Sequence, residues 1–237
     1  MKILFVNQSY CQNVIKSFLV LFVASAVFIT LAADTSPNVV LLISDDHGWG
    51  DVGYHGSEIA TPNIDRLVHD GMELNRFYTY PICSPTRTAL LTGHISMRHK
   101  VFMPFDADSG DLTLTHDDQL MNQAFKDAGY MTMTAGKWHL GHTHVRDFPI
   151  NRGFDHTYGS LEAFPDYWTH NGRGGSKDWA RDGKTVFENG YMTDLFGNEI
   201  SRLIRDRDRS KPFFSYVAFT APHTPFQAPQ EYVDKYA

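Results

Sequence analysis

Runs of consecutive apolar residues, separated by amphipathic or polar stretches, set the pattern of this chain. Pro37–Ser44 is a continuous apolar run of strand length, Tyr130–Thr134 is a second strand candidate, and Phe213–Phe219 is a third. Continuous runs of this length are typical of strands that are covered on both faces of a parallel sheet. We therefore expect Pro37–Ser44 to be a central strand and Phe213–Phe219 to be buried.

Four segments have the spacing or the end residues of helices, and they cover Asn63–Val68, Cys83–Thr92, Thr115–Ala128 and Thr193–Asp208. The second has Pro85 in its first turn and Gly93 at the position of a C-cap. The third opens on the capping-box pattern Thr115-x-x-Asp118. The fourth is amphipathic, with one apolar face.

The order of these elements is strand, helix, strand, helix, strand, which predicts an α/β layered fold. The segment Phe164–Gly190 is rich in Gly, Asp and aromatic residues without a clear period, and we interpret it as a long surface loop. Polar side chains follow each predicted strand. Open α/β sheets bind ligands at the carboxyl ends of their strands, so a site is expected at that edge.

The first 33 residues form a separate segment. Phe18–Ala33 is almost entirely apolar, but its sixteen residues are fewer than the ~20 that a membrane-spanning helix needs. Its small terminal residues suit cleavage, so residues 1–33 are predicted to be a secretory signal peptide, with an uncleaved anchor as the alternative. No second apolar span follows, so no stable membrane span is expected. The predicted location is outside the cell, in the secretory pathway or lysosome, or in a periplasm.

Removing this segment changes the charge and the cysteine count. Lys2 and Lys16 leave with it, which takes the net charge from −6 to about −8 and gives no basic footprint for nucleic acid. Cys11 leaves as well, so Cys83 stands alone and cannot form an internal disulfide. Cys83 is therefore either an inert core residue or a residue retained for its chemistry.

Two pairs of residues are candidates for binding an ion. The adjacent carboxylates Asp45 and Asp46 repel each other, and a hard divalent cation with oxygen ligands would offset this. The alternative is a helix cap with a solvated neighbour. Cys83 and Arg87 share one face at the amino end of a helix, where an anion is favoured and a thiol pKa is lowered. The alternative for Arg87 is a surface salt bridge.

Three further residues could handle protons or negative charge. Lys137 and His139 are two residues apart in a segment expected to be extended, so both are expected to point the same way. His223 lies between Pro222 and Pro225, which would hold it rigidly. Each histidine could equally be structural. Taken with the two ion-binding pairs, these residues describe a site for a tetrahedral anion.

The motif Cys83-Ser84-Pro85-Thr86-Arg87, with Leu91-Thr92-Gly93 after it, resembles the C-x-P-x-R signature of the type I sulfatases. Five further blocks resemble the family in the same order, namely PNVVLLISDDHGWGDVGYHG, TPNIDRL, GKWHLG, NRGFD and FFSYVAFTAPHTPFQAP. The resemblance extends from Pro37 to the last residue. Within the family, the chain is most similar to arylsulfatase B and its relatives.

This resemblance implies an alkaline-phosphatase-like α/β/α layered sheet and hydrolysis of sulfate monoesters, of sulfated carbohydrates or of aryl sulfates. It also implies that a formylglycine-generating enzyme oxidises Cys83 to Cα-formylglycine. The hydrated aldehyde has two hydroxyls, one to attack sulfur and one whose deprotonation releases sulfate. The family metal is usually Ca²⁺, and the implied ligands here are Asp45, Asp46 and residue 83.

The same resemblance implies roles for the remaining site residues. Arg87 and His139 would hold the hydrated aldehyde, and Lys137 and His223 would bind sulfate. His223 could also protonate the leaving oxygen. The expected catalytic set is therefore Cys83, Arg87, His139 and His223, and the expected substrate-binding set is Lys137 and His223.

The chain departs from the family pattern in two ways. His94 stands where the family usually has Arg or Lys after Leu91-Thr92-Gly93. No Asp-Asn dipeptide occurs, although the family completes its metal site with such a pair after a later strand, and a further sulfate-binding lysine is also missing. We therefore expect residues 34–237 to be the N-terminal part of a sulfatase catalytic domain, truncated before its end.

Two alternatives to this interpretation remain. The chain could be a non-catalytic remnant that resembles sulfatases, because part of the metal site is missing. It could also be a phosphoesterase of the same superfamily. Phosphoesterases of that kind use Thr or Ser as nucleophile and lack the C-x-P-x-R motif, which disfavours the second alternative.

Overall fold

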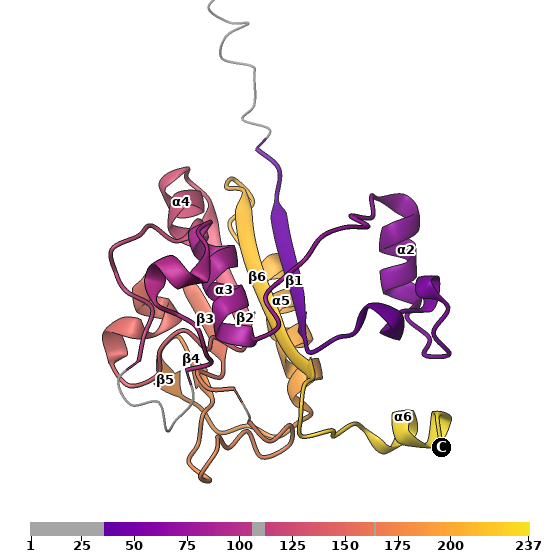
Figure 1. Ribbon diagram of the computed structural model, residues 1–237. Helices are drawn as coiled ribbons and strands as arrows, with labels where there is room; N and C mark the ends of the chain where they lie inside the picture. Colours follow the sequence, from indigo (N-terminus) through magenta and orange to yellow (C-terminus); the bar gives the residue numbers. More distant parts are fainter. Residues whose placement is uncertain (1–35, 106–111, 164) are drawn as a thin grey trace, which may run out of the picture. The chain divides into compact units, whose positions relative to one another are not determined.

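The computed structural model describes residues 36–105, 112–163 and 165–237, so the predicted signal peptide lies outside the described residues. Within them, one mixed sheet has the strand order β1-β6-β2-β3-β4-β5 (Figure 1). The strands are β1 (Val39–Asp45), β2 (Met131–Gly136), β3 (His156–Gly159), β4 (Ala180–Arg181), β5 (Lys184–Thr185) and β6 (Phe213–Pro222). The first four in spatial order are parallel, and β4 and β5 are antiparallel additions.

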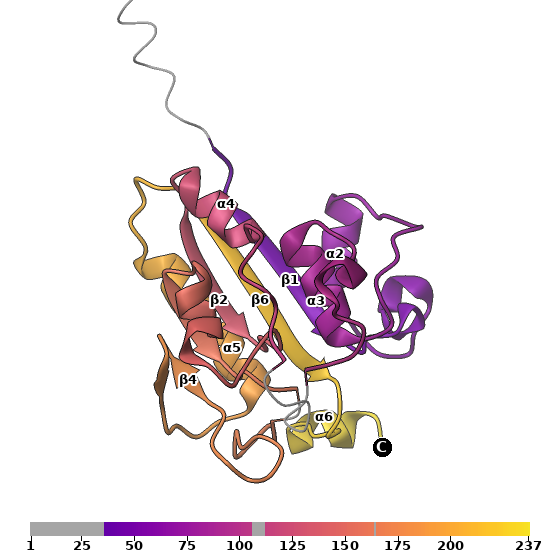
Figure 2. The same ribbon diagram turned by 60° about the vertical axis from the view of Figure 1, so that its left-hand side comes forward.

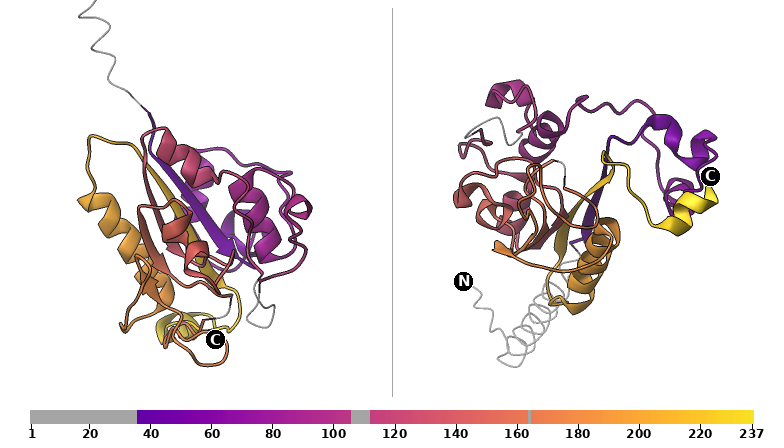
Figure 3. Two further views of the ribbon diagram at one scale, coloured as in Figure 1. Left: turned by 90° about the vertical axis from the view of Figure 1, so that its left-hand side faces the viewer. Right: turned by 90° about the horizontal axis from the view of Figure 1, so that it is seen from below.

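Helices cover both faces of this sheet. The α-helices are α2 (Pro62–Asp70), α3 (Cys83–Thr92), α4 (Met121–Asp127), α5 (Met192–Asp206) and α6 (Gln230–Lys235). Short 3₁₀ helices are η1 (Trp49–Asp51), η2 (Gly53–His55), η3 (Ser96–His99), η5 (Val145–Asp147) and η6 (Pro149–Arg152). Figures 2 and 3 show α3 and α5 on opposite sides of the strands. None of the helices in the described ranges is long and apolar enough to cross a membrane.

The central strand of the parallel part is β6, which pairs with β1 on one side and β2 on the other. Successive residues of a strand point to opposite faces, so both faces of β6 must be apolar. Phe214 and Tyr216 join the core beneath α3 and α4, whereas Phe213 and Val217 join the core beneath α5. The prediction of a buried strand at Phe213–Phe219 is confirmed.

The prediction that Pro37–Ser44 is a central strand is wrong for the described part of the chain. There β1 pairs only with β6 and lies at the edge of the sheet. Val40 and Leu42 are 47% and 53% exposed, because no described element covers the outer face of β1. The apolar run is real, but α5 packs against β2 and β6, and this face of β1 is left exposed among the described residues.

The predicted helix Cys83–Thr92 is confirmed with the same bounds, and Gly93 ends it with a φ of 69°. The helix start predicted at Thr115 is wrong, because α4 begins only at Met121. The Gln123 side chain accepts a hydrogen bond of 2.7 Å from the backbone N–H of Leu120, so the capping interaction lies further along the chain. The predicted helices Asn63–Val68 and Thr193–Asp208 correspond to α2 and α5.

The interpretation of Phe164–Gly190 as a surface loop is also wrong. The segment contributes β4 and β5 and buries three aromatic rings, since Tyr167 and Trp179 are each 1% exposed and His170 is fully buried. The Trp179 ring stacks between His170 and Phe196 of α5. The segment therefore extends the core beside the sheet. Its sequence has no hydrophobic periodicity, so the pattern did not predict this burial.

Gly136 sets how closely β2 and β6 approach at their carboxyl ends. It has a φ of +128°, and a Cβ atom there would lie 2.0 Å from the carbonyl oxygen of Ala218. The next residue, Lys137, donates its backbone N–H to that same oxygen at 2.9 Å. Only glycine fits this contact, and the contact brings Lys137 over the end of β6.

We expect Gly136→Ala to lower the free energy of unfolding by roughly 3–5 kcal/mol, because it combines backbone strain with a clash against a carbonyl group. Gly56→Ala is a matched control, since Gly56 also has a positive φ, +90°, but nothing lies within 4 Å of its added Cβ. The control should lose only about 1–2 kcal/mol. Urea unfolding measures both, and equal losses would contradict the close approach.

Candidate functional site

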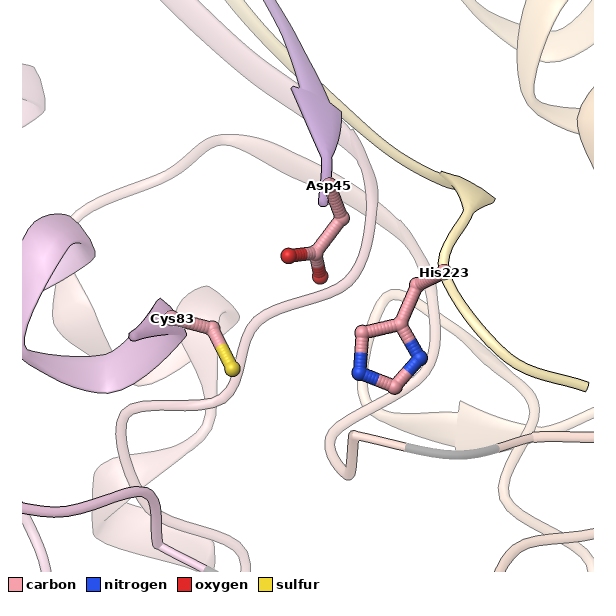
Figure 4. Close-up of side chains that lie close together, drawn as sticks. All are labelled: Asp45, Cys83 and His223. Carbon is pink, nitrogen blue, oxygen red and sulfur yellow. The ribbon is translucent and has the colours of Figure 1, made fainter. Parts of the chain in front are cut away.

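The predicted site residues meet at the carboxyl ends of three parallel strands. Asp45 is the last residue of β1, Lys137 follows β2 and His223 follows β6. Donor atoms of Asp45, Cys83 and His223 all lie within 4.8 Å of one another, and Figure 4 shows the three side chains converging. The expectation that polar groups gather at this edge is confirmed.

A buried ion-pair network centres on Asp45, which is 6% exposed. Lys137 Nζ donates to Asp45 Oδ2, and Arg87 Nη2 donates to the same oxygen at 3.3 Å. Burial raises the pKa of Asp45, but the charges of Arg87 and Lys137 outweigh it and leave that pKa lowered. Asp45 is therefore an ionised carboxylate at neutral pH.

Arg87 is a buried structural cation and not a surface salt bridge, since it is 2% exposed. Besides its bond to Asp45, its Nη1 donates to the carbonyl oxygen of Lys137 at 2.5 Å and to the hydroxyl of Tyr216 at 3.3 Å. These bonds fix the guanidinium plane against the ends of β2 and β6. Arg87 therefore presents a positive charge whose position does not depend on solvent.

Lys137 is the second buried cation, with 1% of its surface exposed. Burial and the neighbouring Arg87 lower its pKa, and Asp45 partly offsets them. Two cations thus share one carboxylate in a region shielded from water. The local charge excess is positive, which suits an anionic ligand.

Cys83 is the first residue of α3 and is only partly buried. It lines an open hollow together with Asp45, Asp46 and Arg87. Figure 4 shows its sulfur directed toward Asp45 and His223. The neighbouring Ser84 hydroxyl donates to the carbonyl oxygen of His139 at 2.9 Å, which ties the start of α3 to the segment after β2. Residue 83 is therefore both accessible and fixed in place.

His139 is fully buried and has a left-handed φ of 57°. The backbone is not extended there, so the expectation of simple alternation from Lys137 to His139 is wrong. The backbone N–H of His139 donates to the carbonyl oxygen of Leu161 at 3.0 Å, which holds this turn. Burial, followed by the charges of Lys137 and Arg87, lowers the pKa of His139 well below 6.5. The ring is neutral in the folded protein.

His223 is 6% exposed, and its Nδ1 lies 2.7 Å from the carbonyl oxygen of Thr224. A carbonyl only accepts, so Nδ1 carries a proton and Nε2 faces the site, 3.5 Å from Asp46 Oδ2. The Tyr167 hydroxyl donates to the His223 carbonyl oxygen at 2.7 Å. Sequence reasoning missed this supporting role of Tyr167, and no spacing in its segment signalled it.

Asp46 lies apart from the buried network. Its φ is 58° and its side chain is 61% exposed, so the adjacent carboxylates Asp45 and Asp46 do not share one buried environment. Calcium takes six to eight oxygen ligands. The described residues supply one exposed carboxylate and one that already receives two cations. This donor set does not complete a calcium site.

Three comparisons relate the chain to known proteins. A family model described as Sulfatase matches residues 37–237. Arylsulfatase J of Mus musculus is 36% identical over 216 residues, covering 86% of this chain and 36% of that protein. The solved structure of Ps i-CgsB has a TM-score of 0.74 at 30% identity and covers 85% of this chain and 48% of its own.

A further solved structure is a complex with its substrate, D-glucosamine-2-N, 6-O-disulfate. It has a TM-score of 0.70 at 28% identity, and the match covers 84% of this chain and 37% of that one. The chain therefore spans less than half the length of each of these relatives. The fold similarity agrees with the predicted α/β/α layered sheet.

We expect the buried neutral state of His139 to make stability fall as the pH drops below 6.5. The unfolded chain protonates His139 near that pH, whereas the folded chain does not, because its pKa is lowered. His139 should add up to ~1.4 kcal/mol per pH unit to the slope of the free energy of unfolding against pH. Urea unfolding at several pH values should show a shallower slope for His139→Gln.

His69→Gln is the control for this experiment, because His69 is an exposed histidine at the end of α2. It should leave the slope of wild-type protein unchanged. An unchanged slope in His139→Gln would mean that His139 is protonated in the folded state.

Proposed function

The chain belongs to the sulfatase family, and we propose that residues 34–237 are the N-terminal part of the catalytic domain of a sulfuric ester hydrolase. Residues 1–33 are proposed to be its signal peptide, which directs the protein to the secretory pathway, the lysosome or a periplasm. The span of less than half of each reported relative supports a partial domain.

One observation carries the proposal for the chemistry. Cys83 lies in an open hollow beside the buried carboxylate of Asp45. Two buried cations, Arg87 and Lys137, both donate to this carboxylate. A sulfate monoester brings one negative charge, and more charge collects on its oxygens and on the leaving group during transfer. Fixed cations that need no reorganisation stabilise that charge. The positive excess at the strand ends is therefore suited to the transition state.

We propose that residue 83 acts as Cα-formylglycine, made from Cys83 by a formylglycine-generating enzyme. The position fits the group, because the side chain is partly exposed and directed toward Asp45 and His223 (Figure 4). The hydrated aldehyde supplies one hydroxyl for attack on sulfur and a second whose deprotonation releases sulfate. Arg87 and the neutral His139 would position it from the buried side.

The two remaining polar residues are proposed to act on the substrate. Lys137 would bind a sulfate oxygen and balance its charge. His223 would also bind sulfate and give a proton from Nε2 to the departing oxygen, since Nδ1 is already occupied with the Thr224 carbonyl. Asp46 Oδ2 lies 3.5 Å from His223 Nε2, so Asp46 could help to orient the ring.

Calcium is proposed as the metal of the whole protein, with Asp45, Asp46 and residue 83 among its ligands. The described donors do not complete the coordination shell, so binding to this chain alone is expected to be weak. The substrate is proposed to be a sulfated carbohydrate or an aryl sulfate. A related structure bound to a disulfated glucosamine supports the carbohydrate choice.

We expect residue 83 to be formylglycine when the chain is produced in a host that contains the generating enzyme. The lone cysteine sits in the motif Cys83-Ser84-Pro85-Thr86-Arg87, at an accessible helix start. Tryptic mass spectrometry should find an aldehyde or its hydrate at this position. Arg87→Ala, which breaks the motif, should leave a thiol that can be alkylated. A fully alkylatable thiol in the wild-type chain would contradict the proposal.

We expect a full-length protein that contains these residues to hydrolyse a chromogenic aryl sulfate in the presence of calcium. His223→Ala should lower kcat by roughly 10²–10³, the usual cost of losing one preorganised donor, whereas the exposed His69→Ala should not. The 237-residue chain should show little or no turnover, because several groups that act together are missing.

Three other outcomes of this assay would contradict parts of the proposal. Equal rates for the chain and the full-length protein would show that residues 34–237 hold a complete site. Faster hydrolysis of the matching aryl phosphate would favour the phosphoesterase alternative. No turnover from a full-length protein that carries formylglycine would favour a non-catalytic sulfatase-like remnant.

A further inference from the structure

A second cluster of possible ligands lies at the far end of α3 from Cys83. His94 follows Gly93, which caps α3, and His99 is the last residue of η3. Asp118 belongs to the loop that precedes α4. Ten helical residues separate the two ends of α3 by ~15 Å, so this cluster is distinct from the site around Cys83.

The geometry of the cluster is that of a small metal site. His94 Nδ1 lies 3.6 Å from Asp118 Oδ1, and His99 Nδ1 lies 3.2 Å from Asp118 Oδ2. One donor atom from each of the three residues falls within 4.8 Å of the other two. Ligands bound ~2.0–2.1 Å from a tetrahedral zinc ion are ~3.3 Å apart. The two measured distances fall on either side of that spacing.

The hydrogen bonding of the cluster is incomplete without an ion. His94 Nδ1 is buried and has no hydrogen-bond partner among the described residues. Its 3.6 Å distance from Asp118 is too long for a hydrogen bond. His99 is also nearly inaccessible, with a side chain 3% exposed. A buried ring nitrogen that faces a carboxylate without bonding to it is the arrangement that a shared cation would satisfy.

We propose that His94, His99 and Asp118 bind a zinc ion, with the fourth position open to solvent. Two imidazoles and one carboxylate suit zinc and related transition metals, whereas calcium prefers oxygen ligands. The side chains of His94 and Asp118 are 35% and 31% exposed, which leaves a path for the ion. Zinc would tie together the end of α3, η3 and the loop before α4.

The surroundings indicate that this site is weaker than a structural zinc site. Histidine ligands usually donate their second ring N–H to a carbonyl or carboxylate, which orients the ring and raises its basicity. His99 Nε2 is buried without such a partner in the described part of the chain. Zinc bound here should therefore exchange readily, and the stabilisation of the chain should grow with the logarithm of the free zinc concentration once that concentration exceeds the Kd.

Cobalt is a suitable probe, because Co²⁺ replaces zinc and gives visible ligand-field bands in tetrahedral sites. We expect the full 237-residue chain to bind one Co²⁺ with such bands, and zinc in excess to remove them. His94→Arg should weaken binding by more than the ~10–100-fold that loss of an outer-shell partner costs. Arginine is cationic and can pair with Asp118 but offers no imidazole nitrogen, so this variant separates metal binding from a simple charge pair.

His69→Arg is the matched control, since His69 also pairs with a neighbouring aspartate, Asp70, but its side chain is 87% exposed. It should bind Co²⁺ as the wild-type chain does. His99→Gln is a second test, in case His94→Arg disturbs folding, and circular dichroism of each variant checks the fold. Loss of binding in both His94→Arg and His99→Gln, with retained folding, would support the site.

The site around Cys83 is the main competitor for the probe, because it also offers a sulfur, an imidazole and a carboxylate. Cys83→Ser should leave the Co²⁺ bands intact, and no thiolate-to-metal charge-transfer band should appear. Excess calcium should not displace the cobalt. The proposal is overturned if no Co²⁺ binds, if His94→Arg binds it normally, or if Cys83→Ser abolishes the bands.

Discussion

The carboxylate of Asp45, buried between Lys137 and Arg87, is the interaction on which the rest of this structure depends. Each of the three residues comes from a different element, namely the end of β1, the start of the segment after β2 and the first turns of α3. Removing charges from water is costly, and only the mutual contact offsets that cost. The network therefore holds three elements in one geometry and leaves a positive excess beside Cys83.

The backbone near the strand ends is shaped to serve this network. Gly136 lets β2 approach β6 closely, while Asp46 and His139 have left-handed φ values that turn the chain out of the sheet. Such conformations are uncommon in residues other than glycine and persist only where their surroundings fix them. For His139, the contacts of Ser84 and Leu161 with its backbone provide that fixation. Rigidity at the edge of the sheet is thus built from strained positions and buried charge together.

Local signals predicted the parts of this molecule that depend on local physics. The bounds of α3 followed from its glycine cap, and the burial of β6 followed from its unbroken apolar run. The exposure of β1 and the buried aromatic rings of Tyr167 and Trp179 depend on distant partners, which spacing cannot reveal. The strand β3 was missed because its four residues carry no apolar pattern. The gathering of Asp45, Lys137 and His223 could be predicted, but the support of His223 by Tyr167 could not.

The outer edge of β1 has a practical consequence. Within the described residues β1 has a partner on one side only, and Val40 and Leu42 lie exposed on its face. Unpaired N–H and C=O groups beside apolar side chains offer a template for strands of other molecules. The net charge of −6 opposes such association by repulsion, and salt screens that repulsion. The colloidal behaviour of the isolated chain is thus set by ionic strength, and dilute, low-salt solutions keep it dispersed.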